Sequence, residues 1–170
     1  MQTLPALTTA LSSLLLTGCL LAQTPYAVGT RDIALANTTG QGSSSLTARV
    51  HFPAATAGSN VPVLPQQGGW PVVVFLHGFL ALGNNYAPVG NALAAAGYIA
   101  VMSNTMQFDN QGQEYDGRAL YSALVTANGT AGGAFTGALD MGRAALVGHS
   151  MGGGNIANVL ANNQIGRAHV

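Results

Sequence analysis

A serine between two glycines follows a short apolar run near the end of the sequence. Residues Gly148-His149-Ser150-Met151-Gly152 read G-x-S-x-G, and residues 144–147 before them are Ala-Ala-Leu-Val. A strand that turns straight into a helix through this pattern strains the backbone of its serine, and the two glycines remove Cβ atoms that would clash in the turn. Such a turn exposes the hydroxyl of Ser150, and an exposed hydroxyl suits nucleophilic attack on a carbonyl.

The neighbouring segments favour this interpretation over a chance match in a chain with 23 glycines. Residues 143–147 are typical of a short buried parallel strand. Residues 155–161 carry apolar side chains at i, i+3 and i+4, which predicts a helix directly after the glycines. The alternative is a glycine-rich turn with an incidental serine.

A second motif follows an earlier apolar run. Residues 71–76 are rich in valine and predict a central buried strand, which ends in His77-Gly78-Phe79. In acyl-transfer enzymes the loop that leaves such a strand donates one backbone N–H to the oxyanion, and the residue after the nucleophile donates another. The predicted donors are therefore the N–H groups of Phe79, with Leu80 as the alternative, and of Met151. An ordinary turn after a strand is the competing interpretation.

These two motifs resemble those of the secreted α/β-hydrolases related to cutinase-type polyester hydrolases, chlorophyllases and platelet-activating-factor acetylhydrolases. Residues 25–31 and 47–53 are similar to the first two antiparallel strands of that group, and the resemblance covers residues 25–163. It implies an α/β fold with a mostly parallel sheet and flanking helices. The chain departs from the family at residues 102–104, where Met-Ser-Asn stands in place of an end like Ala-Pro-Asp.

A serine nucleophile needs a base and an acid, which follow the serine in the chain order of α/β-hydrolases. The chain contains no Asp or Glu after Ser150, and its only later histidine is His169. Asp140 lies at the far end of the strand that leads into the turn at 148–152 (the elbow), about 30 Å from Ser150 by strand rise, and is rejected as the acid. His149 is expected to point away from the serine. We therefore expect the triad acid and base, and the C-terminal part of the fold, to be missing.

The two ends of the chain carry predictions of their own. Residues 165–170 read Ile-Gly-Arg-Ala-His-Val, which matches the translation of a common sequencing adapter, so residues 164–170 are expected to be an artefactual tail. Residues 24–163 then form the N-terminal part of the hydrolase domain.

The N-terminal 22 residues are expected to be a signal peptide, because residues 4–22 are uncharged and mostly apolar. The protein would then be secreted or periplasmic. Residues 16–19 also resemble a lipoprotein box, in which a lipidated Cys19 would attach the protein to a membrane. Cleavage after Ala22 is the alternative.

The amino-acid composition argues against several classes of function. Five Lys and Arg balance five Asp and Glu, so the chain shows no electrostatic footprint for nucleic acid. Its single cysteine cannot form an intrachain disulfide. No ligands occur at metal-site spacing, and neither a metal nor a cofactor is expected.

The remaining pattern predicts alternating strands and helices, typical of a parallel sheet with right-handed crossovers. Trp70 is expected to pack at a strand end, and Tyr86 to line the site or to pack a helix. The predicted elements are strands at 26–35, 46–52, 71–76 and 98–102, loops at 54–70 and 77–85, helices at 86–96 and 116–127, and an irregular segment at 104–115.

The sequence thus predicts a serine hydrolase that cleaves carboxylic esters, of a lipid or a polyester, through an acyl-enzyme on Ser150. A lipase, a dienelactone hydrolase or a thioesterase would share these motifs. A catalytically inactive fragment, or a binding module that keeps the elbow, is the alternative outside the enzymes.

Overall fold

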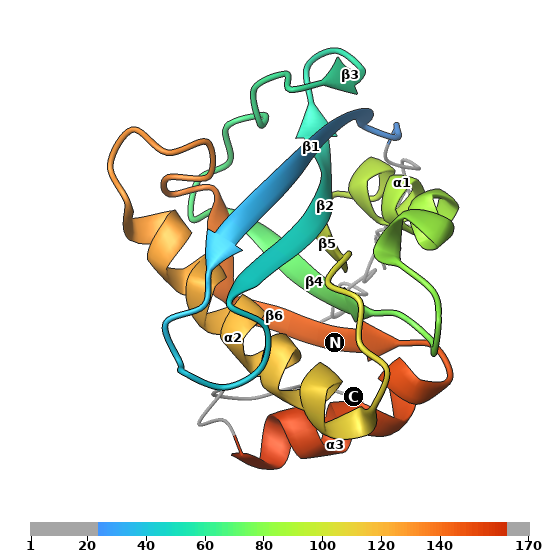
Figure 1. The fold of residues 1–170 in the computed structure, drawn as a ribbon. Coiled ribbons are helices and arrows are strands. Elements are labelled where there is room, and N and C mark those ends of the chain that lie inside the picture. The colour runs from blue at the N-terminus through green and yellow to red at the C-terminus, as the bar shows by residue number, and fades with distance from the viewer. Residues whose placement is uncertain (1–23, 163–170) are drawn as a thin grey trace, which may run out of the picture.

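A six-stranded mixed sheet, in the order β3-β1-β2-β5-β4-β6, lies at the centre of the computed structural model (Figure 1). The structure describes residues 24–162. The signal peptide at 1–22, Cys19 and the tail at 164–170 lie outside these residues and stay predictions. The strands are β1 (Ala27–Ala36), β2 (Ser45–Ala54), β3 (Gly58–Ser59), β4 (Trp70–Leu76), β5 (Ile99–Ser103) and β6 (Leu139–Gly148). The helices are η1 (Gly83–Tyr86), α1 (Ala87–Ala95), α2 (Asn110–Gly129) and α3 (Met151–Asn162).

Strand direction divides the sheet into two parts. β1 and β2 form an antiparallel hairpin, and β2 pairs antiparallel with β5. β5, β4 and β6 are parallel to one another, so their carboxyl ends meet at one edge. This edge carries both sequence motifs. The predicted α/β class is confirmed.

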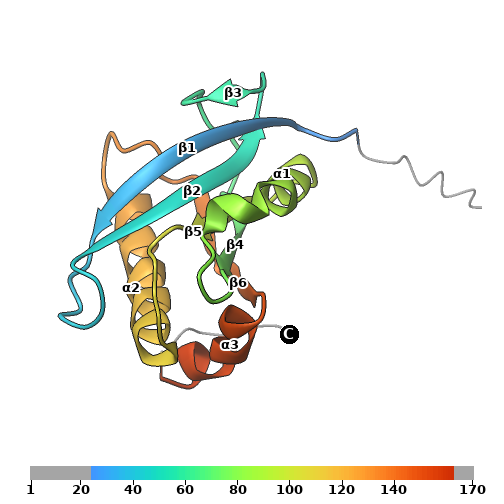
Figure 2. The same ribbon diagram turned by 45° about the vertical axis from the view of Figure 1, so that its right-hand side comes forward.

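The helices cover both faces of the sheet, with α1 on one side and α2 and α3 on the other (Figure 2). Alternating side chains of β4 point to opposite faces. Leu76 packs in the main core with α2 and α3, whereas Phe75 packs beside Tyr86 and Leu93 on the α1 side. Both faces of β4 and β5 are therefore buried, which explains their continuous apolar sequences. The prediction of a buried strand at 143–147 is wrong, because β6 lies at the edge of the sheet and Val147 is 41% exposed.

Three predicted element starts were wrong, and the short strand β3 lies within the predicted loop at 54–70. Helix α3 begins at Met151 and includes the glycines that were expected to precede it. Helix α2 begins at Asn110 and not at 116, because the side chain of Asp109 caps it by accepting a hydrogen bond from the Gly112 N–H at 2.7 Å. Strand β6 begins at Leu139, before its apolar run, and its register against β4 shifts between Pro71 and Val72. The first turn of α2 carries no apolar periodicity, so hydrophobic pattern alone could not find it.

Trp70 packs at the start of β4, as predicted. Its ring is buried against Tyr26 in an edge-to-face contact, and its Nε1 donates to the carbonyl of Leu64 at 2.7 Å. Within residues 24–162, no helix is both long and apolar enough to cross a membrane.

Candidate active site

Strand β6, the elbow and helix α3 place Ser150 at the carboxyl edge of the sheet. Ser150 has a φ of +54°, a left-handed conformation that a residue with a side chain adopts only when the surrounding fold holds it there. Its side chain is exposed, and its hydroxyl has no hydrogen-bond partner among residues 24–162. The predicted strained, exposed serine is present.

The glycines of the elbow are required by close backbone contacts. A Cβ on Gly148 would lie 2.5 Å from the carbonyl carbon of Gly152, and a Cβ on Gly152 would lie 2.6 Å from the carbonyl carbon of Leu76. The N–H of His149 also donates to the Leu76 carbonyl at 3.2 Å. The end of β4 therefore fixes the position of the elbow.

The loop that leaves β4 meets the elbow at Gly78. A Cβ on Gly78 would lie 3.0 Å from Nδ1 of His149 and 3.4 Å from Cβ of Ser150. The backbone N–H groups of Phe79 and Met151 have no acceptor among the described residues. Two unpaired donors thus lie on the two segments that flank the serine, as an oxyanion site requires.

Two buried amide side chains hold the loop that leaves β4 in place. Gln113 of α2 donates through Nε2 to the carbonyl of His77 at 2.7 Å, and Asn155 of α3 donates to Oε1 of Gln113 at 2.9 Å. Gln113 is 3% exposed and Asn155 is 2% exposed. Neither residue is predicted by a sequence motif. The only signal for them is a polar residue at a helical position that faces the core.

The ring of His77 belongs to the same support and not to the reacting groups. It is buried, and its Nε2 lies 2.8 Å from the carbonyl oxygen of Thr105. His77 thereby joins the β4 loop to the segment that follows β5.

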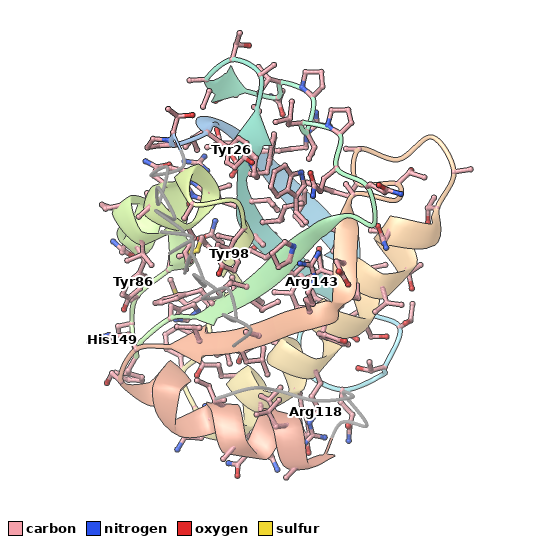
Figure 3. All side chains as sticks on the ribbon, turned by 180° about the vertical axis from the view of Figure 1, so that it is seen from behind. Tyr26, Tyr86, Tyr98, Arg118, Arg143 and His149 are labelled. Carbon is pink, nitrogen blue, oxygen red and sulfur yellow. The ribbon has the colours of Figure 1, made fainter. Side chains whose placement is uncertain are left out.

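Tyr86 joins the two motifs through its hydroxyl. Its Oη accepts from the N–H of Gly78 at 3.2 Å and lies 3.0 Å from Nδ1 of His149. Figure 3 shows Tyr86 and His149 close together at one end of the sheet. The ring of Tyr86 also packs against Phe75 of β4 in the small core on the α1 side, and its role in lining the site stays a prediction. The imidazole of His149 bonds to Tyr86 and not to Ser150.

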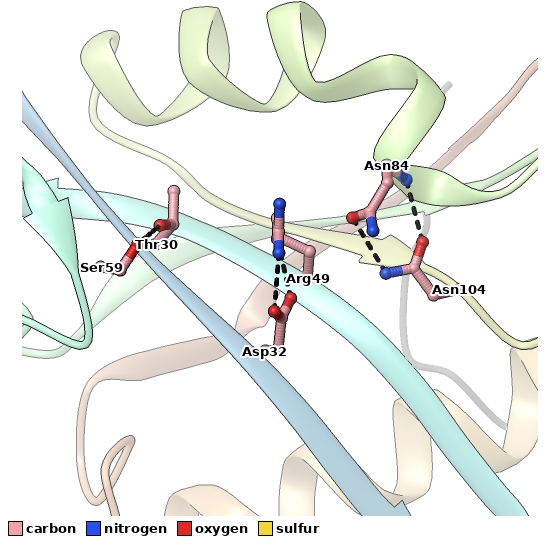
Figure 4. Close-up of polar contacts among 6 residues, drawn as sticks. All are labelled: Thr30, Asp32, Arg49, Ser59, Asn84 and Asn104. Atoms are coloured by element: carbon pink, nitrogen blue, oxygen red, sulfur yellow. Dashed lines mark hydrogen bonds and ion pairs between the residues drawn. The ribbon is translucent and has the colours of Figure 1, made fainter.

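The segment after β5 departs from the family pattern, but hydrogen bonds hold it to η1. Asn104 accepts from the N–H of Asn84 at 2.9 Å, and its side-chain amide donates to Oδ1 of Asn84 at 3.0 Å (Figure 4). This pair attaches η1, and hence Tyr86, to the end of β5.

The charged groups give no base for Ser150 within the described part of the chain. Asp140 lies at the opposite end of β6, where the hydrogen bond from the Arg143 guanidinium lowers the pKa of Asp140. Its rejection as the triad acid is consistent with this position. No imidazole or carboxylate among residues 24–162 bonds to the Ser150 hydroxyl, and these residues contain no cluster of three or more His, Cys, Asp or Glu that could hold a metal.

Comparison with known proteins now adds to this geometry. The sequence model of the PET hydrolase-like family matches residues 16–170. The chain belongs to the PET hydrolase-like family. The α/β-hydrolase fold and the resemblance to polyester hydrolases are thereby confirmed.

This PET hydrolase-like chain is also similar to the bis(hydroxyethyl) terephthalate hydrolase of Streptomyces coelicolor. The two sequences are 29% identical over 130 residues, which make up 76% of this chain and 37% of the relative. The chain therefore spans well under half the length of the relative that it matches.

Proposed function

We propose that the chain carries the nucleophile and the oxyanion donors of a serine hydrolase that cleaves carboxylic esters. One observation carries the proposal: Ser150 is exposed at φ +54°, between segments whose Phe79 and Met151 N–H groups lack an acceptor among the described residues. Family membership and the name of the Streptomyces coelicolor relative support the ester class.

In the proposed reaction, Oγ of Ser150 attacks the ester carbonyl carbon and its proton passes to a base. The Phe79 and Met151 N–H groups hold the resulting oxyanion, and each such donor is worth about 3 kcal/mol in comparable sites. The bond to the alcohol oxygen then breaks, the alcohol leaves with a proton, and the acyl group remains on Ser150. Water cleaves this acyl-enzyme in a second step.

The substrate we propose is an ester with an apolar part. Phe79 and Leu80, directly after Gly78, have side chains that are 53% and 63% exposed. They offer apolar surface on the β4 loop, next to the segment that meets Ser150. The esters of lipids and polyesters both have such apolar parts.

Acylation of Ser150 tests the proposal. The full chain is mixed with a short p-nitrophenyl ester, the p-nitrophenol burst is followed, and the acylated peptide is identified by mass spectrometry. We expect up to one equivalent of acyl group on Ser150 and no burst in Ser150→Ala.

Two outcomes would contradict the proposal. Equal release by Ser150→Ala would place the reaction elsewhere. A folded chain that is never acylated would favour the binding-module alternative.

A further inference from the structure

Tyr86 is the side chain that, among residues 24–162, hydrogen-bonds to both motifs. Gly78 lies one residue before the proposed donor Phe79, and His149 lies one residue before Ser150. The hydroxyl of Tyr86 contacts Gly78 N at 3.2 Å and His149 Nδ1 at 3.0 Å. One oxygen atom therefore connects the two halves of the proposed oxyanion site.

The donors and acceptors at this oxygen fix the direction of the bond to Gly78 and favour one direction for the bond to His149. The backbone N–H of Gly78 can only donate, so Oη accepts from it. The phenol has one hydrogen, which remains free for Nδ1 of His149. Donation of this hydrogen to Nδ1 satisfies both groups and places the hydrogen of the neutral imidazole on Nε2, whereas an Nδ1–H donor would leave the phenol hydrogen without an acceptor among the described residues.

Packing holds the phenol in place. The Tyr86 ring lies 4.6 Å from that of Phe75 and 5.7 Å from that of His149, measured between centroids. The Asn84–Asn104 hydrogen bonds fix η1, the 3-10 turn that ends at Tyr86. The contact with Phe75 and the attachment of η1 to Asn104 are independent of the two groups that the hydroxyl joins.

We propose that Tyr86 is a positioning residue for ester hydrolysis, which aligns the Phe79 and Met151 N–H groups and keeps His149 in its Nε2–H tautomer. The bond to Gly78 fixes the peptide that precedes Phe79. The bond to His149 holds the residue that precedes Ser150 and Met151. This inference rests on the proposed function, because alignment of the two donors matters only if they bind an oxyanion.

The variant Tyr86→Phe tests the proposal, because it keeps the ring and removes the hydroxyl. We expect the maximal rate of acylation to fall about tenfold, since oxyanion donors act mainly in the transition state, while the half-saturating ester concentration stays within about twofold. The matched control is Tyr98→Phe, since the Tyr98 hydroxyl has no hydrogen bond among the described residues. We expect no change there.

Imidazole ¹⁵N spectra supply a readout that needs no turnover. We expect His149 of the wild-type chain to be in the Nε2–H tautomer, and Tyr86→Phe to add the Nδ1–H tautomer. A wild-type chain that is never acylated would defeat the proposed function and the aligning role together, whereas the spectra would still decide whether Tyr86 holds His149.

A second variant keeps the test valid if Tyr86→Phe does not fold. His149→Phe removes Nδ1 but keeps the bond to Gly78, and we expect a smaller fall in acylation rate, about threefold. The double variant should be no slower than Tyr86→Phe alone. The inference would be overturned if the rate losses of Tyr86→Phe and His149→Phe multiplied in the double variant. It would also be overturned by a wild-type His149 that carries its hydrogen on Nδ1, or by an unchanged rate in Tyr86→Phe.

Discussion

The backbone comes unusually close to a neighbour at several glycines, and at two of them the neighbours are of different kinds. At the elbow, a Cβ on Gly152 would meet the carbonyl carbon of Leu76 at 2.6 Å. Between α1 and β2, a Cβ on Gly90 would meet Cδ2 of His51, also at 2.6 Å. The first neighbour is the backbone of a central strand, and the second is a side chain.

This difference separates a fixed contact from an adjustable one. Relief at Gly152 requires α3 to move away from β4, which would displace Ser150. Relief at Gly90 requires only a smaller residue at position 51. Nε2 of His51 is also buried without a hydrogen-bond partner among the described residues. The position of Ser150 thus depends on the backbone contact between Gly152 and Leu76, which no side-chain substitution at a neighbouring residue can relieve.

The largest effect is expected at the elbow. Gly152→Ala should lower the free energy of unfolding by about 3 kcal/mol, because the new Cβ cannot be accommodated without moving backbone. Gly154→Ala is the matched control: apart from its chain neighbours and its own helix backbone, no described residue lies within 4 Å of its added Cβ, so the free energy of unfolding should rise by about 0.5–1 kcal/mol. Urea unfolding measures both, and equal effects would contradict the close contact at Gly152.

A smaller and reversible effect is expected at Gly90. Gly90→Ala should cost about 2 kcal/mol in urea unfolding, since its Cβ overlaps the His51 ring. In a His51→Val background the same change should cost nothing, because the ring is absent and alanine favours the helix.

The reference for this comparison is His51→Val alone, which also removes the bond from Nδ1 to Asn91 at 2.8 Å. If Gly90→Ala costs the same in both backgrounds, then the ring of His51 is not the obstacle.

The buried imidazole also predicts a pH dependence. Burial lowers the pKa of His51 below its ordinary value of 6.5. Between the two values the unfolded chain binds a proton that the folded chain does not bind, so stability falls as the pH drops below 6.5, by at most about 1.4 kcal/mol per pH unit.

Unfolding of the wild-type chain and of His51→Val from pH 7.5 to pH 5 isolates this contribution as the difference between the two curves. We expect the stability of the wild type to fall more steeply with acid. Parallel curves would show that His51 titrates alike in the folded and unfolded states.

The smallest effect is expected for an exposed pair on the hairpin. Asp32 accepts two hydrogen bonds from Arg49 at 2.7 and 2.6 Å, and the Arg49 hydrogen bond lowers the pKa of Asp32 (Figure 4). Both side chains are exposed, so Arg49→Gln should change the free energy of unfolding by less than about 0.5 kcal/mol. NMR titration should show the Asp32 pKa returning towards its ordinary value. A loss comparable to that of Gly90→Ala would contradict this ranking.

Local patterns were enough to predict the elements that carry apolar periodicity and tight turns. The strands around residues 71–76 and 98–102 and the elbow at Ser150 were found because buried parallel strands and a glycine-flanked turn leave unbroken local signals. Residues 110–115 were predicted wrongly, because a capped polar first turn has no apolar face. Gln113 and Asn155 were missed, because their partners lie 36 and 42 residues away.

The sequence by itself determined which residues can act, because Ser150 and its glycines form a single short segment whose conformation follows from local sterics. Only the tertiary structure decided what surrounds them. It brings the β4 loop against the elbow, leaves the Phe79 and Met151 N–H groups without acceptors among the described residues, and places the hydroxyl of Tyr86 between Gly78 and His149. The physical reason is that these contacts join separate parallel strands, and their geometry depends on strand register and packing that no local pattern encodes.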